Sequence, residues 1–305
     1  MQDASLRGKT GFAVGTGRCG TNFLARAVGL EPHVASYHER SPYNDTFHRY
    51  CKWYGLPIDH EGFLHTKEME IRQDLQDHLF SFEASAYLSL SIEELYARFG
   101  AKFLLLVRRP ERMVNSFLEK GWYNKPYYRA DPNLVPSYQE TKFFFLFLAR
   151  FVPSGEKFLE WQTYTRVGKL AWYWNAMNAR ILEQFSNIPV DHWRVEKIED
   201  FQFDRYMDFA RLMGFEPTVT RQTYESLAES RPNKRTGVPT IASWSAQAIV
   251  EFEKEVAPMA QQLGYEYRVD RLPVPEAAHS EESLAGKKPL FNRLHQSLRK
   301  VLAKS

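Results

Sequence analysis

A run of glycine and polar residues near the amino terminus has the composition of an anion-binding loop. Residues 11–14, GFAV, read as a short buried strand, and residues 23–28 follow a helical pattern with apolar side chains on one face. The residues between them are mostly small or polar: Gly15, Thr16, Gly17, Arg18, Cys19, Gly20, Thr21 and Asn22. Backbone N–H groups and the positive end of the helix dipole converge at such a strand–loop–helix junction. The sequence therefore predicts that an anion binds here.

The glycine spacing of this loop fits two classes of protein. Gly15, Gly17 and Gly20 satisfy the dinucleotide pattern G-x-G-x-x-G, and Glu39 follows at about the distance, roughly 20 residues, where an acid holds a ribose. A dinucleotide loop keeps side chains out so that the backbone can approach the pyrophosphate. Here Arg18 lies inside the loop and hydroxyl and amide side chains begin the helix, which suits clustered phosphate and sulfate oxygens. Both interpretations remain open on this loop alone, as does an ordinary turn without a ligand.

A second strand-to-helix junction carries an arginine and a serine. The clearest buried strand of the sequence is KFLLLV at 102–107. Arg108 follows it directly, and Ser116 lies about two turns into the next expected helix. An arginine and a hydroxyl so placed can bind one phosphate from two sides. A dinucleotide-binding domain has no use for this pair.

Taken together, the two junctions resemble the nucleotide-binding motifs of sulfotransferases. The letters RCGTN at 18–22 match the family's loop G-x-x-[KR]-[SC]-G-T-[TSN], and LLLVRRPERMVNSF at 104–117 matches its second motif. The likeness covers about residues 10–267 and is to the broad carbohydrate, tyrosylprotein and bacterial group. It implies an enzyme that transfers a sulfuryl group from 3'-phosphoadenylyl sulfate (PAPS) and needs no metal ion.

The resemblance also implies roles for the residues of both junctions. Arg18 is expected to stabilise the charge that builds on the bridging oxygen as the sulfur–oxygen bond breaks. Cys19 replaces the common serine, and because a thiol is a poor donor its backbone N–H is expected to matter more. The expected nucleotide-binding residues are Gly17, Arg18, Cys19, Gly20, Thr21 and Asn22 on the 5'-phosphate side and Arg108 and Ser116 on the 3'-phosphate.

Two further segments are expected to contribute to the site, one by binding the nucleotide and one by accepting the proton of the acceptor. A late basic loop with Arg231, Lys234 and Arg235 is expected to cover the terminal phosphate, a solvated surface loop being the alternative. An acceptor hydroxyl must lose its proton, and Glu39 is the predicted general base because tyrosylprotein and trehalose-type sulfotransferases keep a glutamate near this place. His38 is the second choice, since neighbours on an extended segment face opposite ways. The simpler alternative is that Glu39 pairs with Arg40 or caps a turn.

The segment FEASAYL at 82–88 resembles the E-K-[ST]-P-x-Y-[FL] segment of heparan-type sulfotransferases. Ala84 stands where that family has a lysine that helps to bind the donor sulfate. Either Arg18 alone carries this charge, or another segment supplies the cation. Glu83 and Ser85 are expected to bind the acceptor or to lie behind residues that do. The acceptor is expected to be a small molecule, a carbohydrate or a lipid-like molecule, and the sequence does not choose among these.

The order of the expected elements predicts one α/β domain of the P-loop type over residues 8–270, with a central parallel sheet flanked by helices. A polar linker at 271–289 and a basic amphipathic tail helix at 290–305 follow. The tail is expected to dock on the domain, on a partner or on an anionic surface. The expected strands are 11–14, 33–37, 80–88, 102–107 and 190–195, and the expected later helices are 91–99, 142–151, 164–185, 203–213 and 244–263.

Composition limits the class of protein. The chain has 305 residues, and 44% apolar residues are enough for a sizeable core. A net charge of +3 suits an anionic ligand but is too small to indicate nucleic acid. The two cysteines and nine histidines have neither disulfide nor metal-ligand spacing. With no signal-peptide pattern and no apolar run of about 20 residues, a cytoplasmic protein without a membrane span is expected.

Overall fold

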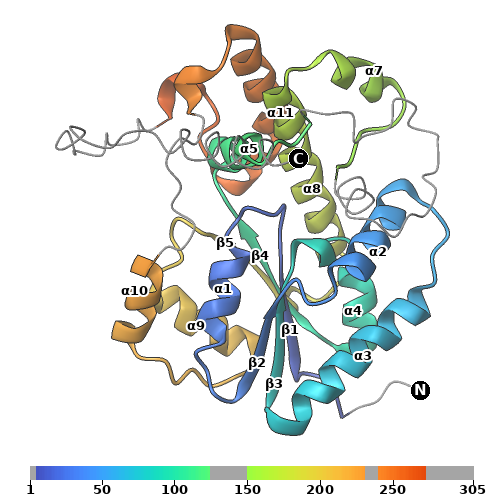
Figure 1. Ribbon diagram of the computed structural model, residues 1–305, viewed down its shortest axis with the longest axis vertical. Coiled ribbons are helices and arrows are strands. Elements are labelled where there is room, and N and C mark those ends of the chain that lie inside the picture. Colours follow the sequence, from blue (N-terminus) through green and yellow to red (C-terminus); the bar gives the residue numbers. More distant parts are fainter. Residues whose placement is uncertain (1–4, 124–149, 231–239, 273–305) are drawn as a thin grey trace, which may run out of the picture. The chain divides into compact units, whose positions relative to one another are not determined.

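Five parallel strands form the central sheet of this protein, as a computed structural model shows (Figure 1). The structure describes residues 5–123, 150–230 and 240–272. The expected α/β class with a parallel sheet is confirmed. The strands are β1 (Thr10–Val14), β2 (Val34–His38), β3 (Phe80–Ala84), β4 (Lys102–Val107) and β5 (Trp193–Lys197).

The strand order is β2-β3-β1-β4-β5, so β1 lies in the middle of the sheet. Its neighbours are β3 and β4, with Phe12 in register with Glu83 on one side and Phe103 on the other. In a dinucleotide-binding domain the first strand pairs with the second. Here β3 separates them, and the dinucleotide-binding topology is therefore wrong for this chain.

Helices cover both faces of the sheet (Figure 1). Alternate residues of the strands supply the two cores, because successive side chains of a strand point to opposite faces. Ala13 and Leu104 belong to the core beneath the first group of helices, whereas Phe12 and Phe103 stack with each other on the other face. The first group is α1 (Thr21–Val28), α9 (Phe203–Met213) and α10 (Arg221–Ser230), and the second is α2 (Pro42–Tyr54), α3 (His60–Asp77), α4 (Ile92–Phe99) and α8 (Arg166–Phe185).

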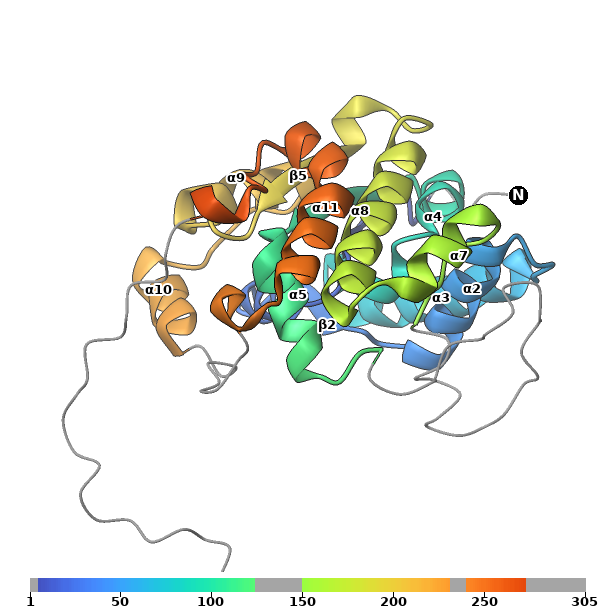
Figure 2. The ribbon, with the colours of Figure 1, turned by 90° about the horizontal axis from the view of Figure 1, so that it is seen from above.

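The remaining helices pack around α8, which runs side by side with α11 (Ala246–Leu263) in Figure 2. Helix α5 (Pro110–Glu119) also packs against α8 and begins directly after β4. Proline at its first position is favourable, because that N–H has no partner within the helix and the ring presets φ. The short elements are α7 (Glu156–Thr163) and the 3-10 turns η1 (Ala86–Leu88), η2 (Val190–His192), η3 (Ile241–Ser243) and η4 (Val269–Arg271).

Most expected elements are found, with three local corrections. The fifth strand begins at Trp193 and not at Val190, because a 3-10 turn follows Pro189. The strand expected at 80–88 ends at Ala84 and continues as η1. The helix expected at 91–99 begins at Ile92, and the Ser91 side chain before it makes no capping hydrogen bond, since its hydroxyl lies 2.8 Å from Nδ1 of His48.

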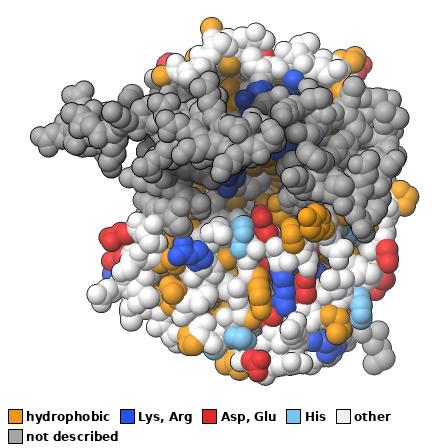
Figure 3. All heavy atoms as spheres, viewed as in Figure 1, with side chains coloured by type: hydrophobic (Ala, Val, Ile, Leu, Met, Phe, Trp, Pro, Cys, Tyr) orange, Lys and Arg blue, Asp and Glu red, His pale blue; other side chains and the backbone are white. Residues whose placement is uncertain are grey.

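Several expectations fall outside the described part of the chain. These are the basic loop, the tail helix, almost all of the linker and the helix at 142–151, apart from its last two residues. Their structure and the domain boundaries remain predictions. Within the described ranges, no helix has both the length and the apolar character needed to cross a membrane. The described surface in Figure 3 carries basic, acidic, histidine and apolar side chains interspersed, in agreement with the small net charge.

Candidate active site

The loop between β1 and α1 turns through left-handed backbone conformations. Gly17 and Gly20 have φ of 82° and 107°, and Arg18 between them has φ of 57°. Residues other than glycine rarely adopt this backbone conformation, so surrounding contacts must hold Arg18 in it. Gly15 is required for a different reason: a Cβ at this position would lie 2.6 Å from the carbonyl oxygen of Leu106. The loop backbone is therefore tightly fixed against β4.

The amino-terminal end of α1 is open to a ligand. Gly20 is the residue before the helix, and it has no side chain that could cap the first turn. The first N–H groups of a helix have no acceptor within the helix and attract anions. Thr21 is buried with its hydroxyl oxygen 3.1 Å from Nε2 of His38, whereas Asn22 is exposed. An anion bound at this end would meet backbone donors and the side chains of both residues.

Arg18 joins the two predicted motifs. Its Nε donates to the hydroxyl of Ser116 on α5 at 2.9 Å, and its carbonyl oxygen accepts from Nη1 of Arg108 at 3.0 Å. Trp174 on α8 in turn donates its indole N–H to the carbonyl of Arg108 at 3.0 Å. The ends of β1 and β4 thus place the two motifs in direct contact. We call Arg18, Arg108 and Ser116 the arginine site.

The arginine site is suited to bind a multiply charged anion. The hydrogen bonds that Arg18 and Arg108 make here are to neutral groups, a hydroxyl and a carbonyl. Burial lowers the pKa of Arg108, an effect that nearby Glu199 opposes and Arg112 increases. A guanidinium nevertheless remains charged in proteins. Two neighbouring cations whose hydrogen bonds do not neutralise them are stabilised when an anion binds between them.

The side chain of Cys19 contributes no charge to the arginine site. Its side chain is fully buried in the apolar core, and burial raises the pKa of its thiol to about 11. It packs beneath the loop, where a Cβ added to Gly15 would lie 2.6 Å from its sulfur. The thiol is neutral at physiological pH, so Cys19 can contribute its backbone N–H to a ligand but not a thiolate.

Glu39 follows β2 and is also held in the left-handed region, with φ of 53°. Its N–H donates to the carbonyl of Ala84 at 3.3 Å, and its carboxylate is hydrogen-bonded to Tyr87. Burial raises the pKa of Glu39, while the positive charges of Arg49 and Arg18 oppose this effect. Among the described residues other than glycine, only Arg18, Glu39 and Tyr123 have positive φ, so strain falls on both predicted catalytic residues.

His38 lies beside Glu39, which corrects the expectation that the two side chains face opposite ways. Its Nε2 is 3.9 Å from Oε1 of Glu39, because the positive φ of Glu39 ends the extended conformation on which that expectation relied. Burial and the charge of Arg18 lower the pKa of His38. The imidazole is therefore neutral at physiological pH, with Nε2 near the Thr21 hydroxyl.

Glu83 and Ser85 are both bonded within the protein. Glu83 is buried, and its carboxylate accepts from Nζ of Lys67 at 3.0 Å and from the backbone N–H of Arg40 at 3.1 Å. Ser85 is fully buried and accepts from the N–H of Tyr87 at 3.2 Å, at the start of η1. Glu83 thus fixes the residue that follows Glu39. Contact with an acceptor remains a prediction for both residues.

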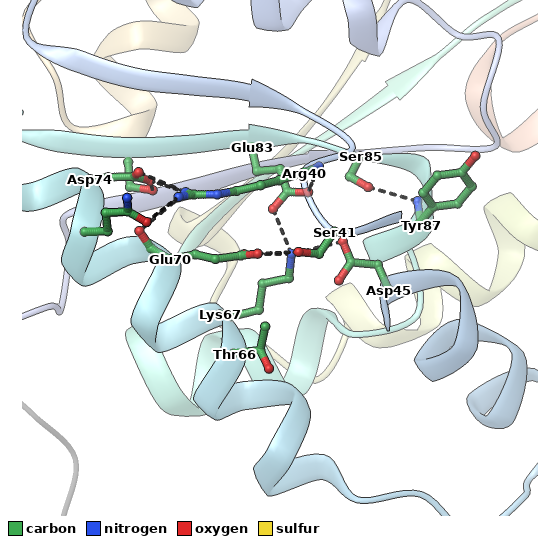
Figure 4. A network of polar contacts seen from close by, with 12 residues as sticks. Arg40, Ser41, Asp45, Thr66, Lys67, Glu70, Asp74, Glu83, Ser85 and Tyr87 are labelled. Atoms are coloured by element: carbon green, nitrogen blue, oxygen red, sulfur yellow. Dashed lines mark hydrogen bonds and ion pairs between the residues drawn. The ribbon is translucent and has the colours of Figure 1, made fainter. Parts of the chain in front are cut away.

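Figure 4 shows a charged cluster around Lys67. Lys67 on α3 is buried and pairs with Asp45 at 3.0 Å, Glu70 at 3.1 Å and Glu83 at 3.0 Å, and we call these four residues the Lys67 cluster. Burial alone would lower the pKa of Lys67, but the three carboxylates raise it. The cluster ties α2 and α3 to β3 and so supports the turn that carries Glu39.

Sequence reasoning missed Lys67 and a second buried cation, Arg49. Arg49 is 1% exposed, and its charge acts on Glu39 and on Tyr173. The sequence offered one signal, since Asp45, Arg49 and Trp53 are spaced four residues apart and share a helix face. Charged residues in line with a tryptophan suggest a buried polar face. The predicted basic residues Arg231, Lys234 and Arg235 lie outside the described residues.

Comparisons with known proteins give the fold. No protein-family model matches the chain, and no curated protein sequence matches it. Among solved structures, the sulfotransferase STF9 from Mycobacterium avium has a TM-score of 0.50 and 10% identity, over 87% of this chain and 79% of that one. The sulfotransferase domain of the curacin biosynthetic pathway has a TM-score of 0.48 and 13% identity, over 86% and 99% of the two chains. That of the olefin synthase of Synechococcus PCC 7002 has a TM-score of 0.47 and 11% identity, over 87% and 98%.

The likeness to STF9 shows that this chain has the fold of a sulfotransferase. The resemblance first read from the two motifs is confirmed at this level. At 10% identity the comparison shows the fold and carries no residue roles. The chemistry must be argued from the site itself.

Proposed function

We propose that this protein is a sulfotransferase that moves a sulfuryl group from PAPS to a hydroxyl or amine of a small-molecule, carbohydrate or lipid-like acceptor. The observation that carries this proposal is the contact between the two motifs. Arg18 is bonded through its side chain to Ser116 and through its carbonyl to Arg108. A nucleotide with phosphates at both ends of its ribose needs two anion sites this close together.

The residues of the arginine site fit such a donor. The uncapped N-terminus of α1 offers backbone donors to the 5'-phosphate, and Arg108 and Ser116 are positioned to bind the 3'-phosphate. Arg18 lies between the two sites. There it stabilises the negative charge that develops on the oxygen bridging phosphorus and sulfur, and this interaction strengthens as the bond breaks.

Glu39 is the proposed general base. Its carboxylate takes the proton of the acceptor hydroxyl while the acceptor oxygen forms a bond to sulfur. The bond from sulfur to the bridging oxygen breaks, and its electron pair stays on the phosphate beside Arg18. Burial raises the pKa of Glu39, which makes its carboxylate a stronger base than that of an exposed glutamate. The neutral His38 lies within 3.9 Å of it.

Aromatic side chains support an acceptor with apolar or sugar faces. Tyr173 donates its hydroxyl proton to the carbonyl of Thr16 in the loop at 2.9 Å, so its ring lies next to the site. The rings of Phe117 and Trp122 have centroids 5.8 Å and 5.4 Å from that of Tyr173. Aromatic rings can contact sugars, phenols and alkyl chains, but Tyr173 and Phe117 are buried, so of these three rings the half-buried Trp122 is the one open to such contact. They favour no one of these acceptors over the others.

Calorimetric titration with adenosine 3',5'-bisphosphate and with NAD tests the donor. We expect the bisphosphate to bind and NAD to bind at least about 100-fold more weakly, because NAD lacks a 3'-phosphate for Arg108. Binding of NAD alone would overturn the proposal. Product mass spectrometry with labelled PAPS and a panel of hydroxyl and amine acceptors then identifies the acceptor class.

A further inference from the structure

Arg49 is a buried cation with donors that the fold leaves unused. It projects from α2, is 1% exposed, and donates from Nη1 to the carbonyl of Ala86 at 2.7 Å. Its Nε and Nη2 have no hydrogen-bond partner among the described residues. Buried donors are nearly always satisfied, and an unsatisfied donor on a charged group is especially costly. The presence of such a costly group indicates that it has a role other than stabilising the fold.

The surroundings of Arg49 place it on the reaction side of the loop. It donates to Ala86, whose Cβ would lie 3.6 Å from a Cβ at Gly17 of the loop. Its positive charge opposes the raised pKa of Glu39, and it also lowers the pKa of Tyr173, which burial raises. The guanidinium carbon is 4.9 Å from the centre of the Tyr87 ring, and Tyr87 is hydrogen-bonded to Glu39.

Aromatic rings hold the guanidinium in place. Besides Tyr87, the ring of Phe151 has its centre 5.1 Å from the guanidinium carbon. Stacking between rings restricts a planar group without using its N–H donors, which remain available in the plane of the guanidinium. Lys67, by contrast, spends its donors on carboxylates. Arg49 is therefore organised to accept a ligand, whereas Lys67 is organised to hold the fold.

We propose that Arg49 binds the sulfuryl group of the donor, with Nε and Nη2 donating to its non-bridging oxygens. This inference rests on the proposed function. In an in-line transfer the sulfur lies between the leaving oxygen beside Arg18 and the acceptor oxygen beside Glu39. Arg49 neighbours both the loop and Glu39, so the sulfuryl oxygens come within its reach. It thereby supplies the cation that Ala84, at the end of β3, does not.

The test compares two nucleotides that differ only in the sulfuryl group. Calorimetry without acceptor measures the Kd of adenosine 3',5'-bisphosphate and of PAPS for the wild-type protein and for Arg49→Gln. We expect the substitution to weaken PAPS about 10- to 100-fold, as for a lost charge-assisted pair of hydrogen bonds, and to change bisphosphate affinity by less than about 3-fold. Arg49→Lys keeps the positive charge but loses the paired N–H donors of the guanidinium. We expect it to weaken the binding of PAPS by about 3- to 10-fold and to leave the binding of the bisphosphate unchanged.

Arg180→Gln is the matched control. Arg180 also stacks on an aromatic ring, 3.9 Å from the centre of Trp53, and donates to a backbone carbonyl at 2.9 Å, but it lies on α8 outside the site. It should leave both affinities unchanged within about 3-fold. If wild-type protein binds both nucleotides and Arg49→Gln weakens both equally or neither, the role of Arg49 is refuted and the proposed function stands. If wild-type protein binds neither nucleotide, the proposed function itself fails.

Discussion

Two groups of buried or half-buried charged side chains in this fold have opposite kinds of partner. In the Lys67 cluster one cation meets three carboxylates, each within 3.1 Å. In the arginine site and at Arg49, the hydrogen bonds of the cations run to a serine hydroxyl and to two backbone carbonyls. Lys67 meets its counter-charges when the chain folds, whereas under the proposed function a bound anion supplies those of Arg18, Arg108 and Arg49.

This difference separates stability from binding. Removing one member of a neutralised buried cluster leaves opposite charges uncompensated and lowers stability. Removing a cation whose hydrogen bonds run to neutral groups breaks no ion pair, so we expect the main loss in the affinity for an anion. Glu39 connects the two groups, because Glu83 of the Lys67 cluster binds the backbone of the residue that follows it. The predictions below test this division, from the largest expected effect to the smallest.

Glu39→Gln should lower turnover by about 10²- to 10⁴-fold, the usual contribution of a general base, because an amide cannot take the acceptor proton. The affinity for adenosine 3',5'-bisphosphate should be retained, since Glu39 is not placed on the nucleotide phosphates. Single-turnover kinetics with calorimetry as the binding control measures both. Near-normal turnover in this variant would show that the base lies elsewhere.

Lys67→Met should reduce the free energy of unfolding by about 3–5 kcal/mol, because the buried Asp45 and Glu83 and the half-buried Glu70 lose their cation. Urea denaturation measures the loss. The control is Lys157→Met: Lys157 pairs with Glu160 and Glu255 but is one-third exposed, and we expect a loss of at most about 1 kcal/mol there. Equal losses in the two variants would contradict the structural role given to the Lys67 cluster.

Arg108→Gln should weaken the binding of adenosine 3',5'-bisphosphate by about 10- to 100-fold. The free energy of unfolding should change by no more than about 1.5 kcal/mol, since one hydrogen bond to a carbonyl is lost. Calorimetry and urea denaturation on the same preparation separate the two effects. A large loss of stability with unchanged affinity would place Arg108 with Lys67, among the charges that hold the fold.

The pH dependence of kcat/KM should show an acid limb set by Glu39. The base must be ionised to accept a proton, so activity falls as the pH drops through its pKa. Burial places that pKa above the ordinary value of 4.5 for a glutamate, and the limb should lie correspondingly higher. His38→Gln should leave the limb in place, because Glu39 and not His38 is the proposed base. A limb that disappears in this variant would assign the base to His38.

The local chemistry of the site could be read from the sequence because it is encoded in short segments. The glycines of the first loop, the cation at Arg18 and the Arg108–Ser116 spacing each depend on a few neighbouring residues. Helix and strand patterns likewise depend on nearby side chains, and they placed β1, β4 and α9 correctly. The errors fell at element ends, where a 3-10 turn or a distant partner such as His48 for Ser91 decides the geometry.

Other properties needed the assembled sheet. The side-by-side position of His38 and Glu39 depends on one positive φ, which no residue type at that position required. The role of Glu83 depends on Lys67, and the placement of Arg49 depends on rings from η1 and from residue 151. Such contacts join residues that are far apart in the chain. The pKa of a side chain and the hydrogen bonds that it makes both depend on these contacts.

The sequence by itself determined that this chain builds two strand-to-helix junctions able to bind anions, because glycine conformation and helix polarity act within a few residues. Only the tertiary structure decided that the junctions share one site. The sheet order, with β1 between β3 and β4, brings Arg18 against Arg108 and Ser116 and sets Glu39 beside them. Packing across the sheet also determined which cations meet carboxylates and which hydrogen-bond to neutral groups, since residues far apart in the chain supply these partners.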